Sequence, residues 1–126
     1  MMNRHEQREK AMITVYDYLL AERDINELLT DVYDCDVKDI DSYFVKVVND
    51  SIANQEKYAK YIDEVLKNWK FERLGMIEKA ILLNGCAEFN LKEISAAIII
   101  DESVELAKKY CDEDAYKLVN RVLDII

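Results

Sequence analysis

The sequence predicts an all-α protein, a compact bundle of about seven helices. The chain of 126 residues has no proline and only two glycines, whereas sheet proteins need many tight turns that depend on these residues. Apolar residues recur at helical spacing along nearly the whole chain. Just over half of the residues are apolar, at 51%, which is enough for a core. We therefore expect one domain, residues 1–126, with turns built from Asn, Asp and Ser.

Four helices are predicted in the first half of the chain, the second of them capped by Asp24. A break near Asp50 and Ser51 should separate the third from the fourth. The expected inner faces are, in order, Ala11, Met12, Val15, Tyr18 and Leu19; Ile25, Leu28, Leu29 and Val32; Ile40, Phe44, Val47 and Val48; and Tyr58, Ile62, Val65, Leu66 and Trp69.

Three more helices follow. The fifth should start near Glu72 and continue to Phe89, and the stretch "NLKEIS" then forms a connecting turn. Asp112 is a suitable cap for the seventh, because its side chain can accept a hydrogen bond from the first turn. The expected inner faces of the last two helices are Ile100, Val104, Ala107 and Cys111, and then Ala115, Leu118, Val119, Val122 and Ile126. No linker or internal repeat is visible.

Charge is unevenly distributed. The formal net charge is −9, which argues against a protein that coats nucleic acid by bulk attraction, since such binding requires Lys and Arg to neutralise phosphates. Residues 1–23 are neutral as a group, and residues 24–41 hold seven acids against Lys38 alone. A solvated loop with helix caps is the simplest interpretation of that acidic stretch.

Cysteine usage and hydropathy indicate a cytoplasmic protein. The chain has an odd number of cysteines, namely Cys35, Cys86 and Cys111, and no two of them form a C-x-x-C pair. A disulfide framework or a zinc site is therefore not expected. No apolar run has the length of a membrane span, and the N-terminus lacks the apolar stretch of a signal peptide.

The residues needed for catalysis are scarce. His5 is the only histidine and lies near the chain start, without a nucleophile and an orienting group nearby in sequence. No glycine-rich loop can hold a phosphate, so no cofactor is expected. Asp101, Glu102 and Glu105 cluster on one helix, where a solvated face is the simpler interpretation than a metal site. These observations predict that the protein is not an enzyme.

Four segments, in order, resemble the NusB family of bacterial transcription antitermination factors. The segment "IDESVELAKKYCDEDAYKLVNRVLD" is similar to the family pattern I-N-E-A-(I/V)-E-L-A-K followed by E-D-S-H-K-F-V-N-G-V-L-D. The stretches "REKAMITVYDYLL", "YFVKVVNDSIANQEKYAKYIDEVLKNW" and "FERLGMIEKAILLNGCAEF" resemble the family's three earlier segments. The resemblance covers essentially the whole chain.

This resemblance implies a fold of two small helical bundles packed across one another. It also implies a binding role: NusB proteins pair with NusE, a ribosomal protein of the small subunit, and together they bind boxA RNA in the transcription elongation complex. Some members form homodimers, so a homodimer is a further expectation.

The family's arginine-rich start, which lies against RNA, corresponds here to Arg4, His5, Arg8 and Lys10, interrupted by two glutamates. Arg8 matches the R of the family's R-E-x-A pattern and is the strongest predicted RNA contact. The alternative for this cluster is an ordinary solvated helix start.

The last helix supplies the other implied RNA contacts: Asp114, Tyr116, Lys117 and Leu118. Leu118 stands where the family usually has Phe, so base stacking is lost there unless Tyr116 compensates; plain core is the favoured alternative for Leu118. The resemblance makes Glu88 a contact to NusE. The chain departs from the pattern at further positions, where Leu83 replaces an Arg, Ala87 a Tyr, Ser95 a Pro, Ala97 a Lys and Arg121 a Gly.

Three hypotheses follow. The first is an antitermination factor that binds boxA-type RNA with NusE. The second is a divergent interaction module that has lost RNA binding. The third is an RNA-modifying enzyme, because the same domain occurs attached to methyltransferases; it ranks last, since no second domain or cofactor loop is present.

Overall fold

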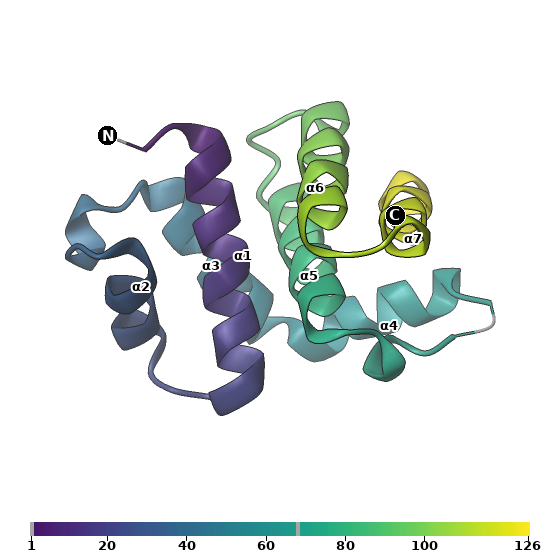
Figure 1. Ribbon diagram of the computed structural model, residues 1–126, viewed down its shortest axis with the longest axis horizontal. Helices are drawn as coiled ribbons and strands as arrows, with labels where there is room; N and C mark the ends of the chain where they lie inside the picture. The colour runs from purple at the N-terminus through teal and green to yellow at the C-terminus, as the bar shows by residue number, and fades with distance from the viewer. Residues whose placement is uncertain (1, 68) are drawn as a thin grey trace.

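Helices account for nearly all of the regular structure. The computed structural model describes residues 2–67 and 69–126, and within these ranges the chain forms seven α-helices and two short 3₁₀ helices (Figure 1). The α-helices are α1 (Arg4–Ala21), α2 (Ile25–Tyr33), α3 (Ser42–Ala53), α4 (Gln55–Val65), α5 (Met76–Leu91), α6 (Ala96–Tyr110) and α7 (Glu113–Ile125). The 3₁₀ helices are Val37–Asp39 and Phe71–Arg73. The all-α prediction is confirmed.

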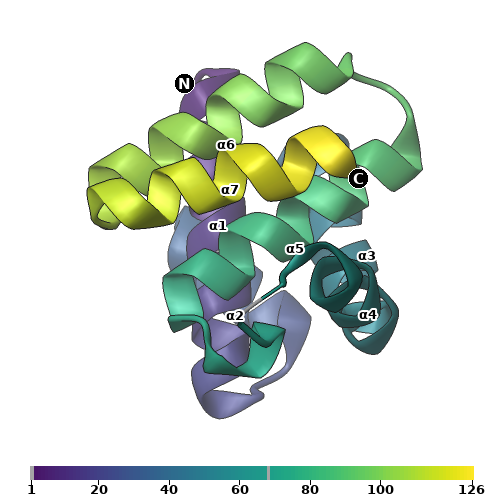
Figure 2. The ribbon, with the colours of Figure 1, turned by 90° about the vertical axis from the view of Figure 1, so that its right-hand side faces the viewer.

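The helices form two groups. Helices α1, α2 and α3 lie on one side of the molecule, and α5, α6 and α7 lie on the other, with α4 beneath them (Figure 1). Helix α5 joins the groups because it packs against α1 and α3 as well as against α6 and α7. A second view shows α6 and α7 side by side across α5 (Figure 2). Two small bundles packed across one another were expected, and this arrangement confirms them.

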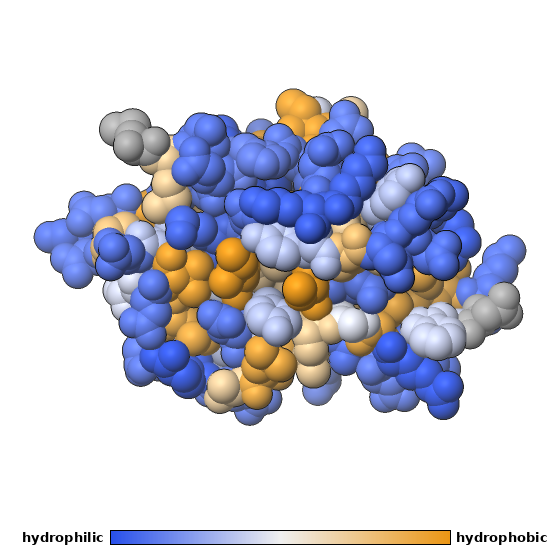
Figure 3. Space-filling view, viewed as in Figure 1, coloured by the Kyte–Doolittle hydropathy of each residue, from blue (hydrophilic) through white to orange (hydrophobic). Residues whose placement is uncertain are grey.

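One apolar core lies beneath both groups. Its fully buried members come from every long helix and include Val15, Phe44, Ile62, Leu82 and Val119. Helix α5 is its centre, since every residue from Ala80 to Glu88 is buried. Polar side chains cover most of the face shown in Figure 3, and apolar atoms appear there in separate patches. No helix among the described residues is long and apolar enough to cross a membrane.

Short polar side chains start the helices. Asp24 and Asp112 accept hydrogen bonds from the first turns of α2 and α7, which confirms both predicted caps. Three of the helices end with a residue in the left-handed region, and these residues are Glu22, Asp34 and Lys92. Gly usually occupies such positions. A chain with two glycines uses charged residues there instead.

Three predicted boundaries are wrong. Asp50 and Ser51 lie inside α3, where Ser51 donates to Asn84 of α5 and Asp50 accepts from Asn90, so both side chains serve packing between helices. Helix α4 ends at Val65, which leaves Trp69 outside it. Helix α5 begins at Met76, because Phe71–Arg73 forms a 3₁₀ turn before it.

The buried faces of α6 and α7 differ in part from the prediction. In α6 the buried residues are Ile99, Ser103, Leu106 and Ala107. Of the predicted face, Ala107 is buried, Ile100 and Val104 are half-buried against the core, and Cys111 is the half-buried residue that follows the helix. In α7 Leu123 is buried, whereas Leu118 is half-buried and Ile126 is exposed. A Cβ added at Gly85 of α5 would lie 2.9 Å from Leu123 Cδ2, so α7 approaches α5 closely at this glycine.

Candidate nucleic-acid and protein interface

The predicted basic cluster lies on the first turns of α1, and each of its four side chains already has a partner within the chain. Arg4 Nη1 lies 3.4 Å from Asp41 Oδ2, and the Arg4 guanidinium also covers the ring of Tyr43. His5 Nδ1 lies 2.7 Å from Glu102 Oε2 of α6. Lys10 Nζ donates to the Val32 carbonyl oxygen at 3.1 Å. The cluster therefore ties α1 to its neighbours.

Arg8 occupies the centre of a buried polar network. Its Nε and Nη2 donate to Glu88 Oε2 and Oε1 at 2.9 and 2.8 Å, which forms a bidentate pair. The Tyr43 hydroxyl donates to Glu88 Oε1 at 2.8 Å. The Arg8 guanidinium lies over the Phe44 ring, 5.3 Å from its centroid.

The network favours charged Arg8. Burial alone would lower the pKa of Arg8, but the hydrogen bonds and negative charge of Glu88 outweigh it and hold that pKa above its ordinary value. Burial and the neighbouring Glu88 likewise raise the pKa of the Tyr43 hydroxyl, which therefore stays a donor.

Arg8 and Glu88 thus have an interior role that sequence analysis missed. It assigned Arg8 to RNA and Glu88 to NusE, but the two residues are 4% and 1% exposed and bind each other. A direct contact of either with another molecule would require this network to open. Their separation of 80 positions explains why no local pattern revealed the pair.

A second set of contacts links α1 to α6. Glu9 accepts from Lys109 Nζ at 2.6 Å and from the Tyr110 hydroxyl. These hydrogen bonds, first from Lys109 and then from Tyr110, hold the pKa of Glu9 below its ordinary value. Together with the contact of His5 with Glu102 in the middle of α6, they join α6 to α1 at two points along its length.

The α7 residues of the predicted site are on or near the surface. Asp114 and Lys117 are exposed, and Lys117 Nζ pairs with Glu113 at 2.8 Å. Tyr116 is half-buried beneath Lys108, whose Nζ lies 5.2 Å from the ring centroid. No hydrogen bond or ion pair between described residues joins this group to the cluster on α1. Helices α5 and α6 lie between α1 and α7 (Figure 1), so the predicted RNA contacts fall in two places.

Leu118 borders two hollows between α7 and the segment after α4. The first, about 270 Å³, is lined by Val65, Leu66, Lys67, Trp69, Leu118, Arg121 and Ile125. The second, about 550 Å³, also includes Trp69 and Leu118, together with Arg73, Asp112 and Asp114. Trp69 is 51% exposed at their junction. Sequence analysis placed Trp69 in the core and left Arg121 without a site, although an aromatic residue among Lys and Arg was a usable signal.

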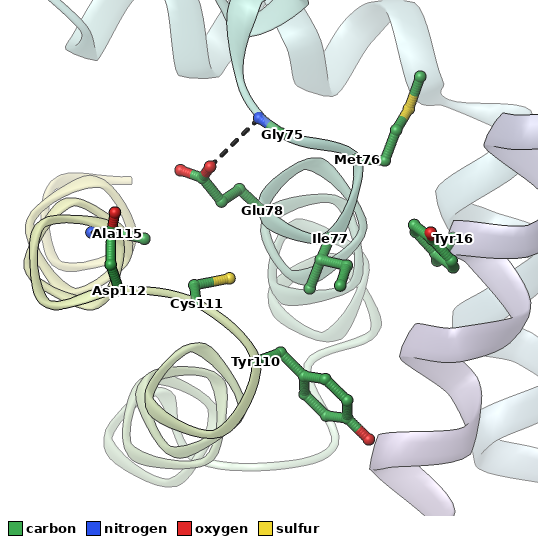
Figure 4. Close-up of a pocket in the computed structure, with 9 residues that line it drawn as sticks. All are labelled: Tyr16, Gly75, Met76, Ile77, Glu78, Tyr110, Cys111, Asp112 and Ala115. Carbon is green, nitrogen blue, oxygen red and sulfur yellow. Dashed lines mark hydrogen bonds between the residues drawn. The ribbon is translucent and has the colours of Figure 1, made fainter.

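A further pocket lies between α1, the start of α5 and the turn from α6 to α7 (Figure 4). Its volume is about 360 Å³, and Tyr16, Met76, Ile77 and Tyr110 give it an apolar wall. Glu78 lies on the opposite side, where it accepts from the Gly75 amide at 3.2 Å.

Cys111 also lines this pocket, and burial, Glu78 and Asp112 raise the pKa of its thiol. The pocket therefore presents aromatic and acidic groups together, without a reactive thiolate. Among the described residues, no group of three or more His, Cys, Asp or Glu side chains is placed to hold a metal ion.

Comparisons with known proteins agree with the fold. The family model described as "NusB family" matches residues 5–126. The transcription antitermination protein NusB of Exiguobacterium sp. is 36% identical over 123 residues, which cover 97% of this chain and 94% of the relative. The protein of the same name from Bacillus licheniformis is 32% identical over 126 residues, covering 99% and 96%.

Two solved structures are also similar over nearly the whole length. A structure of antitermination factors NusB and NusE in complex with dsRNA matches with a TM-score of 0.83 at 31% identity, covering 98% of this chain and 96% of the other. A crystal structure of a plectonemic RNA supercoil contains a chain that matches with a TM-score of 0.86 at 32% identity, covering 99% and 94%. Because the family model matches nearly all of the sequence, this chain belongs to the NusB family.

Proposed function

We propose that this protein is a transcription antitermination factor that binds boxA-type single-stranded RNA together with NusE, within the transcription elongation complex in the cytoplasm. One observation carries the proposal: the chain matches over 98% of its length, at 31% identity and a TM-score of 0.83, a structure of NusB and NusE in complex with double-stranded RNA. The curated relatives share the name of antitermination protein over a similar length.

The charge of the protein suits the protein partner better than the RNA. With a net charge of −9, the chain as a whole attracts a basic protein and repels phosphates. The pocket with Glu78 and Asp112 opposite Tyr16 and Tyr110 offers carboxylates beside an apolar wall. We assign the NusE contact to this pocket, because Glu88 is buried and paired.

The proposal is a binding role without catalysis or a cofactor. RNA affinity of the protein alone should be weak and should fall steeply with salt, since phosphate contacts release counterions. The complex with NusE should bind more tightly because both proteins then contribute contacts. A single-stranded target is favoured because sequence-specific RNA recognition relies on unstacked bases.

The test is fluorescence anisotropy of a labelled boxA RNA at near-physiological salt, with this protein, with NusE from the same organism and with both. A scrambled single strand and a boxA duplex serve as controls. Much tighter binding of boxA by the mixture than by either protein supports the proposal. Binding equal to that of NusE alone overturns it.

A second function has one observation in its favour. Each N-terminal side chain predicted to contact RNA already has a partner within the chain, and Arg8 is buried. This favours an interaction module that holds NusE but has lost RNA binding. Size-exclusion chromatography that shows a complex with NusE, combined with no gain in RNA affinity, would identify this alternative.

A further inference from the structure

We propose that Trp69, together with Lys67, Lys70, Arg73 and Arg121, forms a contact surface for single-stranded RNA, on which a base stacks against the indole. We call these five residues the Trp69 surface. The inference rests on the proposed RNA-binding function and deepens it, since it transfers the main RNA contact from the N-terminal cluster to the opposite bundle.

The first support is geometric. Trp69 is exposed and borders three hollows. One of about 490 Å³ is lined by Lys67, Lys70 and Arg73, and one of about 270 Å³ by Lys67 and Arg121. The third is the hollow of about 550 Å³ described above. The indole therefore stands between spaces with cations on their rims. In Figure 1, the segment after α4 and helix α7, which carry these residues, lie on the same side of the molecule.

The second support is electrostatic. Among the described residues, none of the four cations of the Trp69 surface forms an ion pair, whereas Arg4, Arg8, Lys109 and Lys117 all do. The three hollows around Trp69 together hold these four cations and five acids: Asp63, Glu72, Glu78, Asp112 and Asp114. Three of the acids already accept hydrogen bonds from backbone amides, Asp63 from Phe71, Glu78 from Gly75 and Asp112 from Ala115. Four cations without an ion pair therefore gather around the indole, although the net charge of the chain is −9. Phosphates are the groups that such a surface attracts.

The third support is the apolar lining. Leu118 and Ile125 of α7 lie against the same hollow as Trp69, so the walls that face the indole are aliphatic. Proteins that bind single strands combine aromatic platforms with basic grooves. Leu118 stands where the family pattern has Phe, and the exposed Trp69 lines the same two hollows as Leu118.

Charge also argues against the other occupants. A second copy of this chain would have to bring carboxylates to the cations while both copies carry a charge of −9. A basic protein would be repelled by the four cations themselves. Single-stranded RNA can stack a base on the indole and place its phosphates beside the cations at the same time.

Trp69 is the only tryptophan in the chain, so intrinsic fluorescence reports directly on this surface. The experiment titrates the full chain, alone and in complex with NusE, with unlabelled boxA RNA and with oligouridylate, against a baseline of NusE alone. We expect quenching of the indole emission that saturates at the concentration at which anisotropy shows binding.

Variants test each group separately. Trp69→Leu should weaken RNA binding about 5-fold to 100-fold, as expected for the loss of one stacked base, and Trp69→Phe should retain much of the affinity. Replacing Lys67, Lys70 and Arg121 by Gln should reduce the slope of log affinity against log salt by about 0.7 for each lost phosphate contact.

The matched controls are Tyr61→Leu and Lys57→Gln, which alter an exposed aromatic ring and a lysine 5.9 Å from its centroid, outside all three hollows. Both controls should leave RNA affinity unchanged. Circular dichroism of each variant checks that the helices are intact.

The outcomes separate this inference from the proposed function. If the complex with NusE binds boxA RNA but indole emission and Trp69→Leu affinity do not change, the Trp69 surface is wrong and the function stands. If Trp69→Leu weakens binding of NusE or self-association instead, the occupant is a protein and the inference is overturned. If no RNA binds in any mixture, the inference and the proposed function both fail.

Discussion

Replacing Arg8 by Met should strongly destabilise the fold, because it leaves the Glu88 carboxylate buried without its cation. The side chains of Arg8 and Glu88 are 5% and 2% exposed, and two hydrogen bonds of 2.9 and 2.8 Å join them. Removing one partner of such a pair typically costs about 3–5 kcal/mol. The unfolding entropy of a chain of 126 residues is about 0.26 kcal/mol/K, so the melting temperature should fall by about 10–20 °C.

The assay is thermal unfolding followed by circular dichroism, with a matched control on the same helix. Arg4 also lies over the Phe44 ring, at 5.2 Å, but its pair with Asp41 is 3.4 Å long and its side chain is 54% exposed. Arg4→Met should therefore cost less than about 1 kcal/mol, as exposed pairs do.

A double variant completes the cycle. Arg8→Met combined with Glu88→Gln removes both charges and keeps an acceptor for the Tyr43 hydroxyl, so it should recover a large part of the lost stability. A melting temperature for Arg8→Met that matches the Arg4→Met control would refute the reasoning. The reasoning would also be refuted if the double variant lost as much stability as Arg8→Met and Glu88→Gln lose in sum when each is measured alone.

Three further predictions concern other parts of the chain. The pKa of Glu9 lies below its ordinary value of 4.5, so its contribution to stability is present at neutral pH and is lost as the pH falls through that lowered pKa. Thermal melts should show Glu9→Gln less stable than the parent chain at neutral pH and equal to it in acid. Lys92 adopts a φ of 58° at the end of α5, and Lys92→Gly should raise the free energy of unfolding by about 0.5–1 kcal/mol in urea titrations, because Gly accepts this conformation without strain. Burial raises the pKa of the Cys86 thiol to about 12, so a disulfide reagent should label Cys86 only on unfolding, whereas half-buried Cys35 reacts in the folded chain.

Local patterns were sufficient for much of the fold. The spacing of apolar residues predicted seven helices, and Asp24 and Asp112 marked two of their starts correctly. The α6 face was misplaced because its buried stripe contains a polar residue, Ser103, which apolar spacing cannot detect. Helix α4 was extended too far because no proline or glycine stands between Val65 and Trp69.

The candidate site was harder to predict, because its features depend on residues far apart in the sequence. Arg8 resembles a surface arginine in sequence, and only the fold brings Glu88 against it. Trp69 and Arg121 lie 52 positions apart and share a hollow only after α7 packs beside the segment that follows α4. Family patterns identified the right proteins but could not show which matching residues are exposed.

The contact between Gly85 and Leu123 has a consequence for how this protein can diverge. The family pattern places a glycine at the position of Arg121, whereas here the close approach of α7 to α5 is secured by Gly85 on the opposite helix. Arg121 is exposed, and it lines the hollow beside Trp69 and is not part of the buried core. A substitution at position 121 would therefore change the charge beside the indole without removing a buried contact, so the charge of this surface can vary independently of the stability of the core.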